Sequence, residues 1–249
     1  MCLLALFFRV VEDAPLVAGA NREEYYARGG EPPQILEGLF PALAGIDPQA
    51  GGTWFGVNGQ GVLIAVTNRP KSEVPRQPRS RGLLARDLFA CGTAAAAAER
   101  AVKELEQGHY AGCNFLCADR DSATIIHAGD WLRVRPLSPG IHVLTARDVN
   151  DDRDRRTAHA LRWLSQRSYA SVGQCVAALQ ALCSQKGNGD PPMCLHGPQG
   201  GTVSSSIIAL RLPPERSIYL HAQGSPDATP YVDYSSLLRQ LLRASPPLV

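Results

Sequence analysis

Short apolar runs separated by turn residues dominate the chain and predict a protein rich in β-strands. The first run, residues 1–11, is rich in Phe and Val, as is typical of a buried strand. Further strands are expected at 16–21, 53–57, 62–68, 113–118, 124–128, 131–134, 141–145, 203–212 and 218–222. The runs 53–57 and 62–68 flank Asn58-Gly59-Gln60-Gly61 and predict a β-hairpin. Because both runs are nearly continuous, we expect their sheet to be covered on both faces.

Helical patterns lie between and after these strand blocks. Helices are expected at 83–108, 155–167, 172–185 and 231–243. Gly92-Thr93 predicts a break in the first of them, and Gly108 suits its end. Residues 28–53 are rich in Gly and Pro and are expected to form a long surface loop. The order predicts an α+β fold of two largely antiparallel sheets between helical layers, with one domain over 1–249.

Composition narrows the classes of partner and compartment. A formal net charge of +2 on 249 residues gives no argument for nucleic acid. The first apolar run is too short for a membrane span, and it lacks the basic flank and cleavage site of a signal peptide. Seven cysteines, an odd number without a framework, favour reduced thiols. We therefore expect a cytoplasmic protein without stable membrane insertion.

Cys2 is the candidate nucleophile. A small residue after Met1 permits removal of the methionine, which would give Cys2 both a thiol and an α-amino group of pKa about 7.7–8.0. That amine can act as the base for the thiol. The alternative is that Cys2 is one more small buried hydrophobic residue.

The other chemistry-bearing side chains do not form an obvious site. None of the six histidines has metal-ligand spacing, so no metal is expected. Cys113 and Cys117 lie too far apart along one strand to chelate easily. Cys194-Leu195-His196 is a soft-metal or haem ligand pair without partners in the sequence. Four polar residues, Asn21 to Glu24, directly follow the second strand, where they either reach a site or brace the hairpin.

Several motifs together resemble the NRDE family, which is also called the transport-and-Golgi-organisation protein 2 family. They are Met1-Cys2, Asn21-Arg22-Glu23-Glu24, Gly51-Gly52-Thr53-Trp54-Phe55-Gly56, Thr67-Asn68, Asn114-Phe115-Leu116 and Gly201-Thr202. Glu23 stands where the family usually has Asp. The family is similar to N-terminal nucleophile (Ntn) hydrolases, so the resemblance implies a four-layer αββα sandwich.

The resemblance extends to the penicillin V acylase and bile salt hydrolase branch, and it implies roles for individual residues. Cys2 would be the nucleophile, Glu23 the acid beside it and Asn68 an oxyanion donor. Asn21, Arg22, Glu24, Trp54 and Asn114 would contact the substrate. Three positions depart from the branch, because its Arg before the acid, its second oxyanion Asn and its later Arg fall at Ala20, Ala146 and Val203.

Two functions follow from this resemblance. The first is a slow amide or thioester hydrolase that acts on a hydrophobic or amphipathic acyl compound and requires no cofactor. The second is a non-catalytic binding and trafficking protein for haem or for acyl-CoA and lipids, since the family is associated with both. Haem would need an axial ligand, for which Cys2, Cys194 and His196 are candidates.

Overall fold

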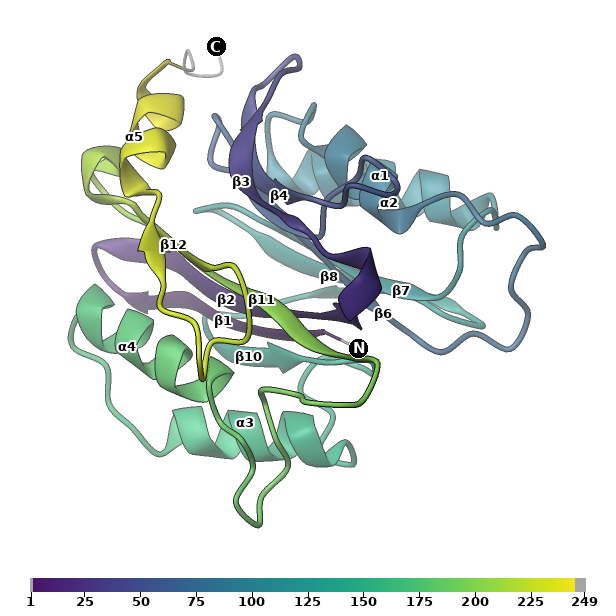
Figure 1. The fold of residues 1–249 in the computed structure, drawn as a ribbon. Coiled ribbons are helices and arrows are strands. Elements are labelled where there is room, and N and C mark those ends of the chain that lie inside the picture. The colour runs from purple at the N-terminus through teal and green to yellow at the C-terminus, as the bar shows by residue number, and fades with distance from the viewer. Residues whose placement is uncertain (1, 245–249) are drawn as a thin grey trace.

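The computed structural model describes residues 2–244, which form two β-sheets and five α-helices (Figure 1). The strands are β1 Leu3–Val11, β2 Ala14–Tyr25, β3 Glu31–Leu36, β4 Ala42–Ile46, β5 Phe55–Asn58, β6 Leu63–Asn68, β7 Cys113–Ala118, β8 Ala123–Ala128, β9 Leu132–Pro136, β10 Gly140–Leu144, β11 Gly200–Leu210, β12 Ile218–Ala222 and β13 Val232–Asp233. The helices are α1 Arg81–Leu88, α2 Ala94–Glu106, α3 Arg155–Ser165, α4 Val172–Cys183 and α5 Ser235–Ala244, with short 3-10 turns η1 Tyr26–Arg28 and η2 Pro214–Arg216.

The strands make two antiparallel sheets that stack face to face. One has the order β10-β1-β2-β11-β12-β13, and the other β3-β4-β5-β6-β7-β8-β9. Helices α3 and α4 cover the outer face of the first sheet, and α1 and α2 cover that of the second (Figure 1). The expected α+β fold with an αββα layer order is therefore confirmed.

Strand β1 shows why the layers form. Its alternate side chains enter two different cores: Leu4, Leu6 and Phe8 pack between the sheets, whereas Leu3 and Phe7 pack against α3 and α4. Each such side chain contributes about 1.5–3 kcal/mol on full burial. A strand that is apolar at nearly every position is thus stable only in the middle of a sandwich.

The region 28–53 corrects the expectation of a long loop. It contains the paired strands β3 and β4, with Leu43 opposite Ile35. The prolines Pro32 and Pro33 do not break β3, because it is the edge strand of its sheet and the register shifts between Glu31 and Gln34. Proline is tolerated where no neighbouring strand needs its missing N–H.

Two other boundaries differ from expectation, and one expected break is present. Strand β2 runs on to Tyr25, so the polar residues of 21–24 lie within the strand and pair with β11. The final helix begins at Ser235, since Val232–Asp233 forms a short edge strand against β12. The predicted break after the first helix is confirmed, with Thr93 capping α2 through its hydroxyl.

Among the residues that the structure describes, no helix is both long and apolar enough to cross a lipid bilayer.

Candidate functional site

A pocket of about 280 Å³ lies where β1 and β2 meet the end of β6 and the start of α1. Its lining includes five residues singled out from the sequence besides Cys2. They are Arg22, Glu23, Glu24, Trp54 and Asn68. Antiparallel pairing of Leu3 with Asn21 places Cys2 beside the polar end of β2, which explains why residues 20 positions apart share one site.

Glu23 is held by a guanidinium from a distant helix. Arg156, at the start of α3, donates from Nη2 to Glu23 Oε1 at 2.5 Å and from Nη1 to Oε2 at 3.1 Å. The Glu23 side chain is only 3% exposed and that of Arg156 13%, so the pair is buried. Burial raises the pKa of Glu23, and the Arg156 guanidinium opposes that rise. Arg156 also donates to the carbonyl oxygens of Pro192 and Met193, which fix its orientation.

Arg22 is held by an aromatic ring, a backbone carbonyl and a nearby acid. Its guanidinium lies over the Trp54 ring, 4.4 Å from the ring centroid, and donates to the Gly29 carbonyl. It also lies 3.8 Å from Asp47, which Arg28 holds in a bidentate contact with distances of 2.6 and 3.2 Å. Although burial raises the pKa of Asp47, the hydrogen bonds and charge of Arg28 together with the Gln49 N–H and the charge of Arg22 outweigh it and hold that pKa below its usual value.

The Cys2 thiol is not activated by its surroundings alone. Burial raises its pKa and the Glu23 carboxylate raises it further, whereas a hydrogen bond from the Glu23 backbone N–H and the charge of Arg22 act in the opposite direction. The thiol is therefore protonated near neutral pH and needs a base before it can attack. Met1, whose removal would expose the α-amine, lies outside the described residues.

Two sequence-predicted site residues do not line this pocket. Asn21 is fully buried and donates to the carbonyl oxygens of Cys183 and Met193, so it links β2 to the end of α4. Asn114 is also fully buried, where it donates to Thr67 and contacts His127 at 2.7 Å. Both amides hold the scaffold around the site.

The sequence did not single out Arg156, Asp47 or Arg28 as part of the site. Arg156 falls in the segment 151–156, whose charges suit a helix start, and Asp47 falls in the region interpreted as a loop. Glu23 and Arg156 are 133 residues apart, so no spacing along the chain shows that they form a pair. Only the fold brings these charges together.

The wall opposite β1 depends on two glycines. Gly52, before β5, and Gly82, in the first turn of α1, touch through their backbones, and Thr53 N–H donates to the Gly82 carbonyl at 3.0 Å. A Cβ on Gly52 would lie 2.3 Å from the Gly82 carbonyl carbon. This contact brings Ser80, Arg81 and Gly82 into the lining of the pocket.

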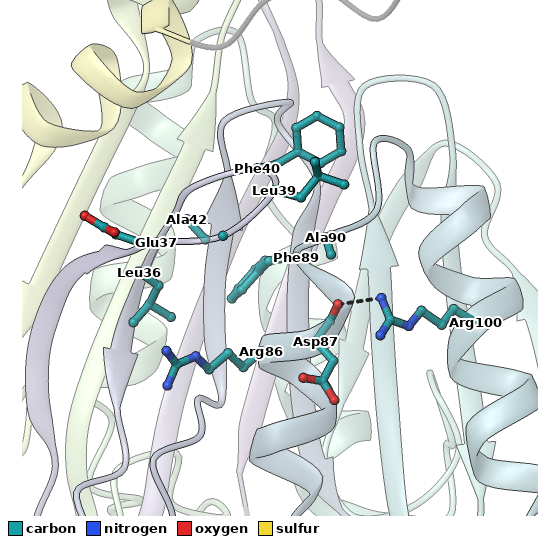
Figure 2. A pocket seen from close by; sticks show the side chains of 11 residues that line it. Leu36, Glu37, Leu39, Phe40, Ala42, Arg86, Asp87, Phe89, Ala90 and Arg100 are labelled. Carbon is teal, nitrogen blue, oxygen red and sulfur yellow. Dashed lines mark hydrogen bonds between the residues drawn. The ribbon is translucent and has the colours of Figure 1, made fainter.

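Another hollow, of about 210 Å³, lies between the β3–β4 turn and α1 (Figure 2). Leu36, Leu39, Phe40 and Phe89 give it an apolar lining, and Arg100 crosses to donate to the Asp87 carbonyl at 3.0 Å. No Cys or His is among its lining residues, so the Cys2 pocket is the candidate for chemistry.

Comparison with known proteins agrees with this geometry. A family model described as Transport and Golgi organisation 2 matches residues 1–196. The human Transport and Golgi organization protein 2 homolog is 30% identical over 139 residues, which cover 52% of this chain and 50% of that protein. The cattle homolog is 31% identical over a stretch of the same length and coverage. The match thus spans about half the length of these curated relatives.

Solved structures share the fold at low sequence identity. A Caenorhabditis elegans ortholog of N-acylethanolamine-hydrolyzing acid amidase superposes with a TM-score of 0.58 at 12% identity, covering 98% of both chains. Penicillin V acylase from Agrobacterium tumefaciens superposes with a TM-score of 0.54 at 12% identity, over 96% of this chain and 88% of that one. Since the family model matches well over half of the chain, this protein belongs to the Transport and Golgi organisation 2 (NRDE) family, and its fold is that of the Ntn hydrolases.

Proposed function

We propose that this protein is a cysteine Ntn hydrolase of low turnover that cleaves an amide or thioester bond in a hydrophobic or amphipathic acyl compound. The observation that carries the proposal is the position of Cys2. It lies at the start of a central strand, in a pocket that also contains Glu23 and Asn68. The similar acid amidase and acylase are named for hydrolysis of acylated compounds, which favours the same reaction class.

The proposed reaction begins with removal of Met1. The α-amine of Cys2 takes the thiol proton, and the sulfur attacks the acyl carbonyl carbon to form a tetrahedral intermediate. The Asn68 amide, at the end of β6, donates to the oxyanion. The protonated amine then gives its proton to the leaving amine or thiol, and an acyl-enzyme remains. Water adds to the acyl carbon, the acid departs and the thiol is restored.

The raised pKa of Cys2 supports a role for the amine as base. A thiol buried beside a carboxylate is ionised less readily than one in water, so its own acidity supplies little thiolate. Glu23 holds a negative charge next to the thiol and, in the processed protein, next to the new ammonium group. Arg156 keeps that carboxylate in place, which is a positioning role.

The size and the charged residues of the pocket favour a substrate whose reacting group is small and polar and which also carries an anionic group. A volume of about 280 Å³ is at the lower end of typical ligand pockets, about 300–1,000 Å³, so it accommodates the reacting group and only part of a long chain. Four arginines line it against three acids: Arg22, Arg28, Arg79 and Arg81 against Glu23, Glu24 and Asp47. Arg79 is already paired with Asp87 and Glu104, whereas Arg81 donates to the Gly112 carbonyl. Arg81 therefore favours a substrate that carries an anion, such as an acyl-CoA.

Arg81 also supports a second candidate, in which the pocket binds acyl-CoA without cleaving it. Loss of the branch's oxyanion Asn at Ala146 favours slow or absent turnover, because one such donor is worth about 10²–10³ in rate. Haem finds less support at this pocket, since no histidine is among the described residues that line it and Cys2 is the only soft ligand.

Intact-mass spectrometry of the purified protein, with and without acyl-CoA and acyl-amide substrates, tests the proposal. We expect a mass lacking Met1 and a substrate-dependent acyl adduct that disappears in Cys2→Ala. Cys91 is a half-buried thiol outside the pocket lining, so Cys91→Ser is the matched control and should keep the adduct. Retained Met1 would block the amine and overturn the mechanism. Met1 removed without an adduct, but with ligand bound in native spectra, would support the carrier.

A further inference from the structure

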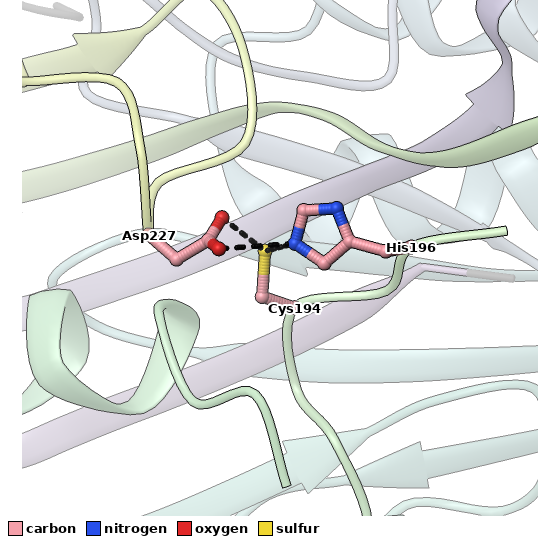
Figure 3. A group of neighbouring side chains, drawn as sticks. All are labelled: Cys194, His196 and Asp227. Carbon is pink, nitrogen blue, oxygen red and sulfur yellow. Dashed lines mark hydrogen bonds and ion pairs between the residues drawn. The ribbon is translucent and has the colours of Figure 1, made fainter.

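Three side chains that are not adjacent in the sequence converge beside the first sheet (Figure 3). Cys194 and His196 come from the segment before β11, and Asp227 comes from the loop after β12. One ligand atom from each lies within 4.8 Å of the other two. Cys194 lies in a bend and His196 in an isolated bridge to Gly201, and their side chains meet two residues apart.

We infer that Cys194, His196 and Asp227 form a binding site for Zn²⁺, with the fourth coordination position open to water. Thiolate, imidazole and carboxylate are the three side-chain ligands that zinc takes in proteins. Softer Cu⁺ favours sets of Cys and Met, and harder Mg²⁺ or Ca²⁺ favours oxygen alone, so this mixed set is best matched to zinc.

The distances between the ligand atoms agree with tetrahedral zinc. Bonds of about 2.3 Å to sulfur and 2.0–2.1 Å to nitrogen and oxygen place ligand atoms about 3.5 Å apart for S–N and S–O and about 3.3 Å apart for N–O. The observed separations are 3.7 Å for Cys194 Sγ to His196 Nε2, 3.1 Å for Sγ to Asp227 Oδ1 and 3.0 Å for Nε2 to Oδ2, so the sulfur and the nitrogen contact different oxygens of one carboxylate. One carboxylate oxygen lies within 4.8 Å of both other ligand atoms, and a rotation of the Asp227 carboxylate toward them completes the coordination shell.

The ligands are held in place by their backbones before any metal binds. Thr202 N–H donates to the Leu195 carbonyl at 2.8 Å, Leu195 N–H donates to the Thr202 hydroxyl at 2.9 Å, and His196 bridges to Gly201. The Asp227 side chain is only 4% exposed, and Lys186 Nζ lies 3.0 Å from its Oδ2. Carboxylates that bind a metal are commonly held by an outer hydrogen bond, and Lys186 supplies one to Asp227.

The neighbouring pocket supplies the open position. A hollow of about 310 Å³ is lined by His196, Thr202, Val203 and Ser225 among others, so water can reach the metal from that side. On binding, the thiol proton leaves to solvent, and the imidazole takes the tautomer with its proton on Nδ1 so that Nε2 is free to bind. The hydrogen bonds of Cys194 and His196 to Asp227 give way to bonds from all three residues to the zinc.

The site has a structural consequence for the Cys2 pocket. The residue before Cys194 is Met193, whose carbonyl accepts hydrogen bonds from Asn21 at 3.0 Å and from Arg156 at 3.2 Å. Zinc would therefore fix the segment that orients Arg156 and, through it, Glu23. The metal inference rests on its own ligands and stands whether or not the Cys2 site is catalytic.

Metal competition and cobalt substitution test the inference. Protein purified with a chelator is titrated with Zn²⁺ against a chromophoric chelator, and separately with Co²⁺ to detect a thiolate-to-cobalt charge-transfer absorption. We expect one Zn²⁺ per chain and a charge-transfer band. In Cys194→Ser the band disappears, and in Cys194→Ser, His196→Ala and Asp227→Asn zinc affinity falls by at least about 100-fold, beyond the effect of outer-shell partners.

Cys91→Ser and His109→Ala, which change the same residue types elsewhere, are the matched controls and keep wild-type affinity. Circular dichroism without metal checks that each variant is folded. Zinc should also raise the unfolding temperature of wild type and of the controls but not of Cys194→Ser. Equal zinc affinity in wild type and the three ligand variants would overturn the inference. So would haemin binding that requires Cys194 in a protein that binds no zinc.

Discussion

Glu23 influences both of its neighbours in the pocket, since its carboxylate raises the pKa of the Cys2 thiol and pairs with Arg156. Replacing it by Gln removes the negative charge beside the sulfur and leaves the guanidinium unneutralised, and both changes favour the thiolate. We expect Glu23→Gln to lower the pKa of Cys2. At a fixed pH near 7, alkylation of Cys2 by iodoacetamide, followed by peptide mass spectrometry, should then be faster than in wild type.

The matched control for this experiment is Glu24→Gln, one residue further along β2. Glu24 also lines the pocket, but it accepts from the Tyr25 N–H and pairs with Arg28, and it is not among the groups that shift the pKa of Cys2. Its substitution should leave the alkylation rate of Cys2 within about twofold of wild type, since a screened surface pair contributes little. Slower alkylation in Glu23→Gln would contradict the assigned sign of the Glu23 effect.

Arg156→Gln tests the buried pair from the other side. Removing one partner of such a pair costs about 3–5 kcal/mol in the free energy of unfolding, because the remaining charge stays buried. The loss should depend on pH. Arg156 lowers the pKa of Glu23, so without it that already raised pKa rises further. A carboxyl whose pKa is raised by folding favours the folded state at low pH and loses that contribution as pH increases through it.

The stability deficit of Arg156→Gln relative to wild type should therefore be larger at pH 8 than at pH 5, as measured by guanidinium unfolding. Arg153→Gln, three residues away, is the matched control, because Arg153 is 85% exposed and solvent screens its contact with Asp151. Its effect should be within about 0.5 kcal/mol at both pH values. An Arg156→Gln deficit that grows as pH falls would contradict the account.

The sequence was informative about residues that lie near each other on one strand or hairpin, and less so about partners from distant elements. Cys2, Arg22 and Glu23 come together because β1 and β2 are consecutive antiparallel strands, which the apolar pattern predicts. Arg156 reaches the same place only through the packing of α3 on the first sheet. The sequence singles out Asn21 and Asn114 as substrate contacts, whereas the NH2 groups of both amides donate buried hydrogen bonds to the scaffold.

At the scale of elements, periodicity located most strands and helices and failed where composition misled. Apolar runs predicted the hairpin of β5 and β6, whose pairing of Phe55 with Ala65 confirms it. The strands of the region 28–53 were missed because Pro and Gly suggest turns, whereas an edge strand tolerates proline. The extent of β2 was underestimated, since its polar residues find partners only when β11, from the far end of the chain, lies beside it.

The contact between Gly52 and Gly82 sets the wall that α1 contributes to the pocket. Gly52→Ala would place a methyl group 2.3 Å from the Gly82 carbonyl carbon, which is rigid backbone, so α1 has to move away. We expect a destabilisation of about 1–3 kcal/mol, typical of overpacking, in guanidinium unfolding. Alkylation of Cys2 should also change, because Ser80 and Arg81 move with α1.

Gly38→Ala is the control for this prediction. A Cβ there meets only the Phe40 carbonyl oxygen at 3.9 Å, an ordinary contact. Its stability should be unchanged or higher by up to about 1 kcal/mol, since alanine restricts the unfolded chain. Equal stability of the Gly52→Ala and Gly38→Ala variants would show that the wall is not rigid.

On the scale of the whole molecule, apolar packing lies between the layers of the sandwich and the polar candidate sites lie at its edges. The two sheets bury their inner faces against each other, and the helices bury the outer ones, so the described strand ends are where polar side chains can gather. At one such edge lies the Cys2 pocket, and the Cys194 cluster lies beside the same sheet. Both draw on segments far apart in the sequence, which is why the sequence pattern singled out Cys2 as a candidate but not the residues around it.

Because both sites draw on distant segments of the fold, ligand binding should raise the unfolding temperature of the whole protein. A ligand that binds only the folded protein adds about 2.7 kcal/mol at 100 times its dissociation constant, which for a chain of this size raises the unfolding temperature by about 5–10 °C. We expect that shift with a non-hydrolysable thioether analogue of acyl-CoA. In the proposed hydrolase, the shift produced by the thioester itself should decay over hours as free CoA thiol appears.

The Cys2→Ala variant separates the two proposed functions. It should retain the shift with the thioether, since Arg22 and the other arginines of the lining are intact. With the thioester, the variant's shift should persist where the wild-type shift decays. A wild-type shift that persists with both compounds would favour the carrier, because binding would then occur without turnover. Absence of a shift with either compound, in protein lacking Met1, would remove acyl-CoA as the ligand and leave acyl amides as the class that the pocket fits.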